Sequence, residues 1–191
     1  MLMKRSTAAG LAVALDTVKD ALRVSSDVTE DDDRLEQLIR SETARYEAFT
    51  GRVLLPTTYR LSLSWWGFPV CLPVMPVRAV TGVTYLDAEH VEQTLSVGAW
   101  YATEAAPQWS VDLVSNAGLP VLSDRPWPVR VAFEAGHDDP AASGGGDDAL
   151  LAPRPEDADA IIHMVGVIFD QGFPLDFDSM RKMFGARRVI G

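Results

Sequence analysis

The sequence predicts an α+β protein: a small helical bundle from the N- and C-terminal helices, with an inserted antiparallel β-sandwich or barrel-like region. Two observations support this prediction. Apolar residues recur at helical spacing near both ends of the chain, whereas they alternate with polar residues in the middle. The expected order is an N-terminal arm and helices (1–56), a β-rich domain (57–136), a flexible acidic and glycine-rich loop (137–154), and a C-terminal helix with a basic tail (155–191) that packs with residues 1–56.

Two helices are expected in the N-terminal part. The first spans about residues 16–24, with Asp16 as its N-cap. The second has Thr29 as its N-cap and Asp32 three residues later, a spacing similar to a capping box, and Gly51 ends it. The apolar face of the second helix consists of Leu35, Leu38, Ile39, Tyr46 and Phe49.

From Thr57 to Glu134 the hydrophobic period changes to two, which is the spacing of half-buried strands. Six or seven short strands separated by glycine, proline and asparagine are typical of an antiparallel sandwich or a small barrel. The single cysteine, Cys71, lies in the apolar run 69–73 and is expected to be a small buried residue. The strands are expected near residues 58–63, 80–86, 92–95, 100–103, 109–113 and 129–134.

A third helix is expected to begin at Pro155 and to end at Gly172. Its apolar stripe consists of Ile161, Ile162, Val165, Ile168 and Phe169. We expect the residues before the first helix to be a cytosolic arm, because the apolar run 11–15 is too short for a signal peptide.

The charge of the chain is unevenly distributed. Its net charge is −10, with 27 acidic and 17 basic residues, which argues against a surface that binds duplex nucleic acid. Residues 181–191, in contrast, contain four basic residues and no acidic residue. A basic tail on an acidic body indicates either docking to a partner or a solvated, frayed terminus.

Common catalytic patterns are missing from the sequence. The histidines His90, His137 and His163 form no metal-binding or catalytic motif, and His163 is expected to be a structural histidine in an apolar helix. We therefore expect no enzyme activity, no cofactor and no metal. The aromatic pairs 65–66 and 100–101 leave open an alternative, a small β-domain hydrolase or carbohydrate-binding module.

Taken in order, these segments resemble the head–tail connector (adaptor) family of tailed bacteriophages and phage-derived gene transfer agents, over about residues 14–170. The segments that carry the resemblance are the opening helix 15–24, the aromatic-x-x-x-Thr-Gly-Arg ending at 46–52, the Leu-Pro and Pro-Val pattern at 72–80, its continuation at 83–87, and Trp-Pro before the strand that ends at Gly136. One departure is the sequence Ala88-Glu89-His90, which lacks the glycine usual at that turn.

The resemblance implies a structural virion protein at the head–tail junction, made in the host cytoplasm. It implies a homo-oligomeric ring, commonly of twelve subunits, bound under the portal protein. Such a ring extends the DNA channel and provides the docking platform for stopper or tail-completion proteins. DNA would pass through the lumen without specific binding, and no membrane is involved.

Two segments are the candidate contact sites. The basic tail mixes charged side chains with apolar anchors, and we expect it to order when it docks to the portal. The acidic loop is expected to contact the next subunit or the stopper. The portal-docking residues are Met180, Arg181, Lys182, Met183, Phe184, Arg187, Arg188, Val189 and Ile190. The loop residues are His137, Asp138, Asp139, Asp147 and Asp148.

Overall fold

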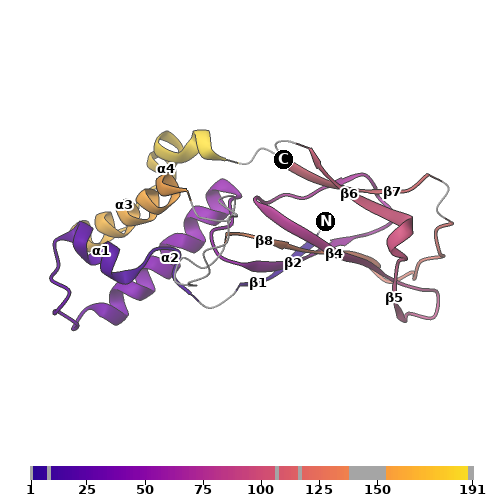
Figure 1. Cartoon of the computed structure of the whole chain (residues 1–191), viewed down its shortest axis with the longest axis horizontal. Helices are drawn as coiled ribbons and strands as arrows, with labels where there is room; N and C mark the ends of the chain where they lie inside the picture. The colour runs from indigo at the N-terminus through magenta and orange to yellow at the C-terminus, as the bar shows by residue number, and fades with distance from the viewer. Residues whose placement is uncertain (1, 8–9, 106–107, 116–117, 138–153, 189–191) are drawn as a thin grey trace. The chain divides into compact units, whose positions relative to one another are not determined.

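The computed structural model describes residues 2–7, 10–105, 108–115, 118–137 and 154–188 (Figure 1). The chain divides into two compact units. We call residues 2–7 and 57–136 the β unit, and the other described residues, 10–56, 137 and 154–188, the helical unit. The prediction of a mixed α+β protein is confirmed, since helices and antiparallel sheets are both present.

The helical unit is built around one apolar core. Its elements are α1 (Leu15–Leu22), α2 (Asp32–Thr50), α3 (Pro155–Gln171), α4 (Phe177–Phe184) and a 3₁₀ turn, η2 (Gly185–Arg187). The predicted apolar faces are confirmed: Leu35, Ile39 and Tyr46 of α2 and Ile161 of α3 are fully buried. The core comprises Ala12, Val13, Val18, Leu35, Ile39, Tyr46, Leu54, Leu55, Ala160, Ile161, Met164, Val165, Met180 and Phe184.

Helix ends agree with the sequence where glycine or proline sets them and differ where a polar cap was expected. Gly51 ends α2 with φ 74°, and Pro155 occupies the first turn of α3. The N-cap of α2 is Asp31 rather than Thr29, and the N-cap of α1 is Ala14 rather than Asp16; neither makes a side-chain capping hydrogen bond. For α2 the reason is tertiary, because a buried lysine holds the preceding loop, as described below.

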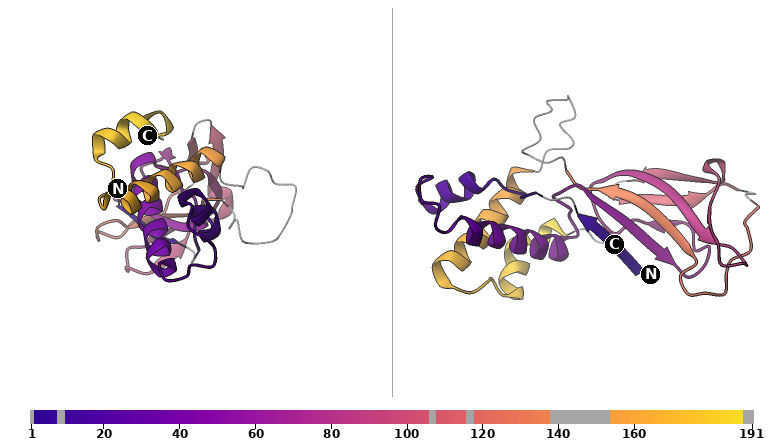
Figure 2. Two further views of the ribbon diagram at one scale, coloured as in Figure 1. Left: turned by 90° about the vertical axis from the view of Figure 1, so that its left-hand side faces the viewer. Right: turned by 90° about the horizontal axis from the view of Figure 1, so that it is seen from below.

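The β unit contains two antiparallel sheets (Figure 2). The larger has the order β1-β2-β8-β4-β5 and the smaller the order β3-β7-β6. In the described residues neither sheet closes on itself, so the barrel-like alternative is wrong, whereas face-to-face sandwich packing stays a prediction. The strands are β1 (Leu2–Thr7), β2 (Thr57–Leu63), β3 (Val70–Cys71), β4 (Val77–Leu86), β5 (Glu92–Thr94), β6 (Trp100–Ala105), β7 (Gln108–Leu113) and β8 (Val129–Ala135), with a 3₁₀ turn, η1 (Val97–Ala99), before β6.

Alternation along β2 and β8 is confirmed and explains their pairing. Tyr59 faces Phe133 and Leu61 faces Val131 in an antiparallel register, and all four side chains are at most 2% exposed. The rings of Tyr59 and Phe133 stack with centroids 5.2 Å apart. Because inward residues recur every second position, this register places the apolar set of both strands on one face.

Residues 2–7 were expected to belong to an arm, but they form β1 and pair with β2 along their whole length. The register joins Arg5 to Tyr59, more than fifty positions away in the chain. Without β1, the outer side of β2 would be a free sheet edge. A short strand that carries two basic residues gives little local signal, so only the partner strand reveals it.

Cys71 is exposed, which contradicts the prediction that it is buried. It lies on the two-residue strand β3 between Val70, 8% exposed, and Leu72, which is fully buried. In an extended segment neighbouring side chains point to opposite sides. Burial of both flanking apolar residues therefore turns Cys71 toward solvent.

The β4–β5 hairpin shows how the missing glycine is replaced. His90 adopts the left-handed backbone conformation, with φ 65°, that a glycine would take without strain. Asp87 supports the turn: its Oδ1 accepts hydrogen bonds from the backbone N–H groups of Glu89 and Val91, at 3.1 and 2.9 Å. The pKa of Asp87 is lowered, chiefly by a hydrogen bond from the side-chain amide of Gln93 and also by these N–H groups.

Candidate functional site

The structure orders most of the predicted docking segment. Residues 177–184 form α4, and Asp176 caps it by accepting a hydrogen bond from the Ser179 N–H at 2.7 Å, which lowers the pKa of Asp176. Met180 and Phe184 are 3% and 4% exposed and belong to the core of the helical unit. In the structure, residues 177–184 are a packed helix whose apolar positions fall on one helical face, whereas docking of the segment to a portal stays a prediction. Val189 and Ile190 lie outside the described residues.

The charged side chains of this segment lie at its surface. Arg181, Lys182 and Arg188 are exposed, whereas Arg187 is half-buried. Met183, 46% exposed, and Phe177, 64% exposed, add apolar area to the same segment. We call Phe177, Arg181, Lys182, Met183 and Arg188 the C-terminal surface. It combines three basic side chains with two exposed apolar groups, and the exposed acids Asp176 and Asp178 lie on either side of Phe177 in the sequence.

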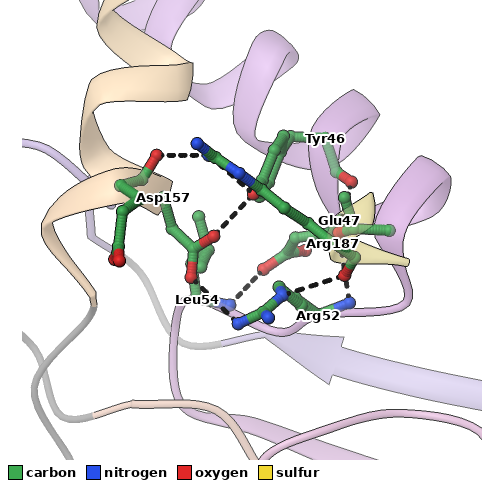
Figure 3. Close-up of polar contacts among 8 residues, drawn as sticks. Tyr46, Glu47, Arg52, Leu54, Asp157 and Arg187 are labelled. Atoms are coloured by element: carbon green, nitrogen blue, oxygen red, sulfur yellow. Dashed lines mark hydrogen bonds and ion pairs between the residues drawn. The ribbon is translucent and has the colours of Figure 1, made fainter. Parts of the chain in front are cut away.

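A buried polar cluster holds the C-terminal segment in place (Figure 3). The Tyr46 hydroxyl donates a hydrogen bond to Oδ1 of Asp157 at 2.5 Å, and Arg52 pairs with Oδ2 of Asp157 at 3.3 Å. Arg187 donates from Nη1 to the carbonyl of Glu156 at 2.5 Å and to the Tyr46 hydroxyl at 3.5 Å. Nε of Arg52 in turn donates to the backbone carbonyl of Arg187 at 3.1 Å. The cluster thus links the end of α2, the first turn of α3 and η2.

The electrostatics of the cluster favour a neutral tyrosine. Burial raises the pKa of Tyr46 to about 12; the hydrogen bond from Arg187 opposes the shift and Asp157 adds to it. A tyrosine with this pKa is a poor general base at neutral pH. The arrangement therefore serves structure: it satisfies buried polar groups and fixes the position of α4 and η2.

The Thr-Gly-Arg motif is the local scaffold of this cluster. The Thr50 hydroxyl donates to the carbonyl of Tyr46 at 2.8 Å and accepts from the Arg52 N–H at 3.2 Å. Gly51 supplies the left-handed turn between them. The Glu47 carboxylate accepts from the Leu54 N–H at 2.8 Å, which holds the chain beyond the turn. The Thr-Gly-Arg motif therefore positions Arg52 so that its guanidinium pairs with Asp157.

Sequence reasoning identified one half of the cluster and missed the other. Asp157 is 1% exposed, yet in the sequence it is an ordinary acid in the first turn of a helix, where the helix dipole explains it. Its available signal was its place two residues after Pro155, inside the turn that an apolar stripe buries. The buried Met164 was also absent from the predicted stripe of α3.

The loop residues give less information. His137 is 6% exposed, and Asp138, Asp139, Asp147 and Asp148 lie outside the described residues. His163, expected to be a structural histidine within its helix, is exposed instead, because it falls on the face of α3 opposite the core. Among the residues that the structure describes, no group of three or more histidine, cysteine or carboxylate side chains is placed to hold a metal ion.

One constellation in the β unit superficially resembles a catalytic triad. Nδ1 of His90 lies 2.6 Å from the Ser123 hydroxyl and 3.8 Å from a carboxylate oxygen of Asp124. In a triad the serine and the acid contact opposite ring nitrogens, whereas here both lie at Nδ1. The Ser123 hydroxyl also accepts from the Arg125 N–H at 3.1 Å, so this group caps a turn.

The two aromatic pairs do not form flat platforms. Trp66 packs against Phe68 and Tyr85 and donates from Nε1 to the carbonyl of Pro120 at 3.2 Å, while its neighbour Trp65 is 66% exposed. Trp100 and Tyr101 are consecutive residues of the strand β6, so their side chains point to opposite sides of it. In the other pair, which lies at a bend, Trp66 is packed whereas Trp65 is exposed, so neither pair presents one stacking surface. No helix in the described part of the chain is long and apolar enough to cross a bilayer.

Comparison with known proteins gives a result for the fold alone. No family model matches the chain, and no curated protein matches it. A chain in the neck of an empty gene transfer agent particle, computed with C6 symmetry, matches with a TM-score of 0.76 and 21% identity. A chain in the virion of a native gene transfer agent particle matches with 0.75 and 22%, and one in the neck of the native particle, computed with C12 symmetry, with 0.70 and 20%.

These likenesses establish a shared fold. Each match covers all of this chain and 97% of the other chain, so both units and their order along the sequence correspond. The structural neighbours are components of virions and of virion necks. The resemblance read from the sequence motifs is thus confirmed in part, as a fold shared with chains of gene transfer agent particles.

Proposed function

We propose that this chain is a structural component of the neck of a tailed phage or of a phage-derived particle, and not an enzyme. The observation that carries the proposal is the whole-length match to chains of gene transfer agent necks. The fold comprises two units of different type in a fixed order, so a match over the full length is more specific than a match to either unit alone.

In this proposal the chain is a head–tail adaptor that forms a homo-oligomeric ring of twelve subunits under the portal. The neck structures of two neighbours were computed with C6 and C12 symmetry, which supports a cyclic assembly of that order. A ring of identical subunits requires a heterologous contact that closes by rotation. The ring extends the DNA channel and presents a platform for stopper or tail-completion proteins.

The charge of the chain suits passage of DNA without specific binding. With a net charge of −10, the acidic residues that face the lumen repel phosphates, so that DNA slides instead of being held. An assembled ring should therefore not retain duplex DNA at low salt. Tight retention of a random duplex would contradict this part of the proposal.

Portal docking is assigned to the segment from Met180 to Ile190, and contact with the next subunit or the stopper to the loop at 137–148. Met180 and Phe184 anchor the segment in the core, so its exposed charges are the groups available to a partner. Deleting the segment would also remove core residues, so a loss of portal binding would not distinguish lost docking from unfolding. A sharper variant is Arg188→Glu, whose side chain lies over the ring of Phe49 at 5.3 Å and is exposed.

The test is co-assembly with the portal protein of the same particle. Purified chain and portal are mixed, and the complex is examined by native mass measurement and electron microscopy of the neck. We expect a ring on the portal and weaker binding by Arg188→Glu, with Arg125→Glu, an exposed arginine of the β unit, as the matched control. A chain that never associates with portals or necks, and that instead binds sugars or turns over a substrate, would favour the hydrolase or carbohydrate-binding alternative.

A further inference from the structure

The loop between α1 and α2 carries a concentrated negative charge. Residues 25–33 contain five acidic residues and no basic residue. Asp27, Glu30 and Asp33 are exposed, and among them Val28 is 43% exposed. We call Asp27, Val28, Glu30 and Asp33 the acidic corner. It combines one exposed apolar side chain with three exposed carboxylates.

A buried lysine, Lys19, holds the loop that forms the acidic corner. Lys19 is 2% exposed, and its Nζ donates to the carbonyl of Val28 at 2.8 Å and to that of Ser26 at 3.4 Å. The same Nζ forms an ion pair with Asp32. Burial of an ammonium group is unfavourable unless its partners are well placed, and here its partners include the carbonyls of an otherwise exposed loop. This bonding fixes the backbone under Val28 and pre-organises the corner for a contact.

Among the described residues, no basic side chain forms an ion pair with Asp27, Glu30 or Asp33; the ion pair of this loop joins Lys19 to Asp32. Arg34 lies over the ring of Phe169, 5.9 Å from its centroid, and thus toward α3. Arg23 closes α1 in the left-handed conformation, before the loop begins. The C-terminal surface has the opposite charge from Arg181 onward: Arg181, Lys182 and Arg188 are exposed together with Met183, whereas the exposed acids Asp176 and Asp178 lie at the start of α4.

These two surfaces cannot meet within one chain. The corner precedes the first residue of α2, Asp32, whereas Phe177 contacts Phe49 near the other end of that helix, with ring centroids 5.6 Å apart. At 1.5 Å rise per residue the two positions are about 25 Å apart, well beyond the screening length at physiological salt. Figures 1 and 2 show the loop after α1 and the yellow C-terminal helix at separate places on the helical unit.

We propose that the acidic corner of one copy docks on the C-terminal surface of the next copy, and that this contact links the subunits of the ring. Val28 packs against the exposed Met183, and the carboxylates face Arg181 and Lys182. The contact is heterologous, since each copy contributes a different surface at each end, which is the geometry that generates a closed ring. The inference rests on the proposed ring. Within the C-terminal surface it assigns Arg181, Lys182 and Met183 to the next copy in place of the portal, and it leaves Arg188 and the chain after it for the portal.

The test is a charge exchange on exposed side chains. One variant carries Asp27→Lys and Asp33→Lys, a second carries Arg181→Glu and Lys182→Glu, and a third combines all four changes. Sedimentation velocity at rising protein concentration and about 50 mM salt measures self-association, and circular dichroism checks that each variant is folded. The control, Glu89→Lys with Glu104→Lys, makes the same charge change on exposed residues of the β unit.

We expect either reversal to weaken self-association at least about tenfold, and the combined variant to regain most of that loss because the charges match again. The control should behave as the wild type, and about 500 mM salt should weaken the wild-type contact. The proposal is overturned if the wild type stays monomeric at millimolar concentration, if the reversals have no effect, or if the combined variant is no better than either reversal.

A second arm separates this contact from the neck role. The same variants are mixed with portal, and the rings are imaged. Loss of closed rings with each reversal, and their return in the combined variant, supports the contact. Intact rings with both reversals refute it and leave the adaptor role standing. Failure of the wild type to join the portal refutes the adaptor role, and the contact with it.

Discussion

Replacing Asp157 by alanine tests the buried polar cluster most directly. The carboxylate is 1% exposed and accepts a hydrogen bond from Tyr46 at 2.5 Å and an ion pair from Arg52 at 3.3 Å. Its removal leaves a buried hydroxyl and a largely buried guanidinium, 17% exposed, without their acceptor. Breaking a buried pair in this way costs about 3–5 kcal/mol. Because Arg52 keeps some exposure to solvent, we expect the free energy of unfolding to fall by about 3 kcal/mol.

The location of the tryptophans makes the measurement specific. All five lie between residues 65 and 127, in the β unit, so tryptophan fluorescence reports that unit, whereas circular dichroism at the helical band reports the helical unit. Urea unfolding of Asp157→Ala should show the loss in the helical signal. Asp157→Asn keeps an acceptor for Tyr46 and should lose about half as much.

The matched control is Asp159→Ala, an exposed acid in the same turn of α3. It should leave the free energy of unfolding within about 0.5 kcal/mol of the wild type. If Asp157→Ala were equally mild, the carboxylate would not be the shared acceptor of Tyr46 and Arg52, and the account of how the C-terminal segment is held would be wrong.

Three further predictions follow from single residues. The pKa of Tyr46 is raised from 10.0 to about 12, so its contribution to the free energy of unfolding is present below pH 10 and is lost as pH rises toward 12, by up to about 2 kcal/mol. The difference in tyrosinate absorbance between the wild type and Tyr46→Phe should show that Tyr46 loses its proton only near pH 12. Gly51→Ala should cost about 1 kcal/mol, because φ is 74°, whereas Gly98→Ala, which meets nothing within 4 Å, should be near neutral; thermal unfolding decides. Cys71 should react with a thiol reagent in the folded chain at a rate close to that of a free thiol, and slow reaction would contradict its exposure.

Local periodicity predicted the elements that bury a regular face. In α2 the spacing of Leu35, Ile39 and Tyr46 and the stop at Gly51 are properties of adjacent residues, and the structure agrees with both. The same is true of the alternation through Tyr59 and Phe133. The Thr29 cap failed because the competing force is not local: Lys19, ten positions earlier, binds the loop that a cap at Thr29 would have shaped.

At the candidate surfaces, too, the sequence showed the local pattern and missed the contacts between distant residues. The sequence identified the basic residues near Arg181, but it could not show that Met180 and Phe184 pack into the core and leave the charges outside. It singled out the motif at Arg52 and missed Asp157, which lies 105 positions away. The acids around Asp33 are visible in the sequence, but the buried Lys19 that holds their loop is found only in the structure.

The sequence alone determined where α1, α2, α3 and most strands lie, because these elements depend on backbone preference and on the burial of neighbours within a few residues; α4 was not among the predicted helices. Only the tertiary structure decided that residues 2–7 complete a sheet, that Cys71 faces outward, and that Tyr46, Arg52, Asp157 and Arg187 share one site. Each of these outcomes depends on partners far apart in the chain, whose shape and charge complement each other only after folding brings them together.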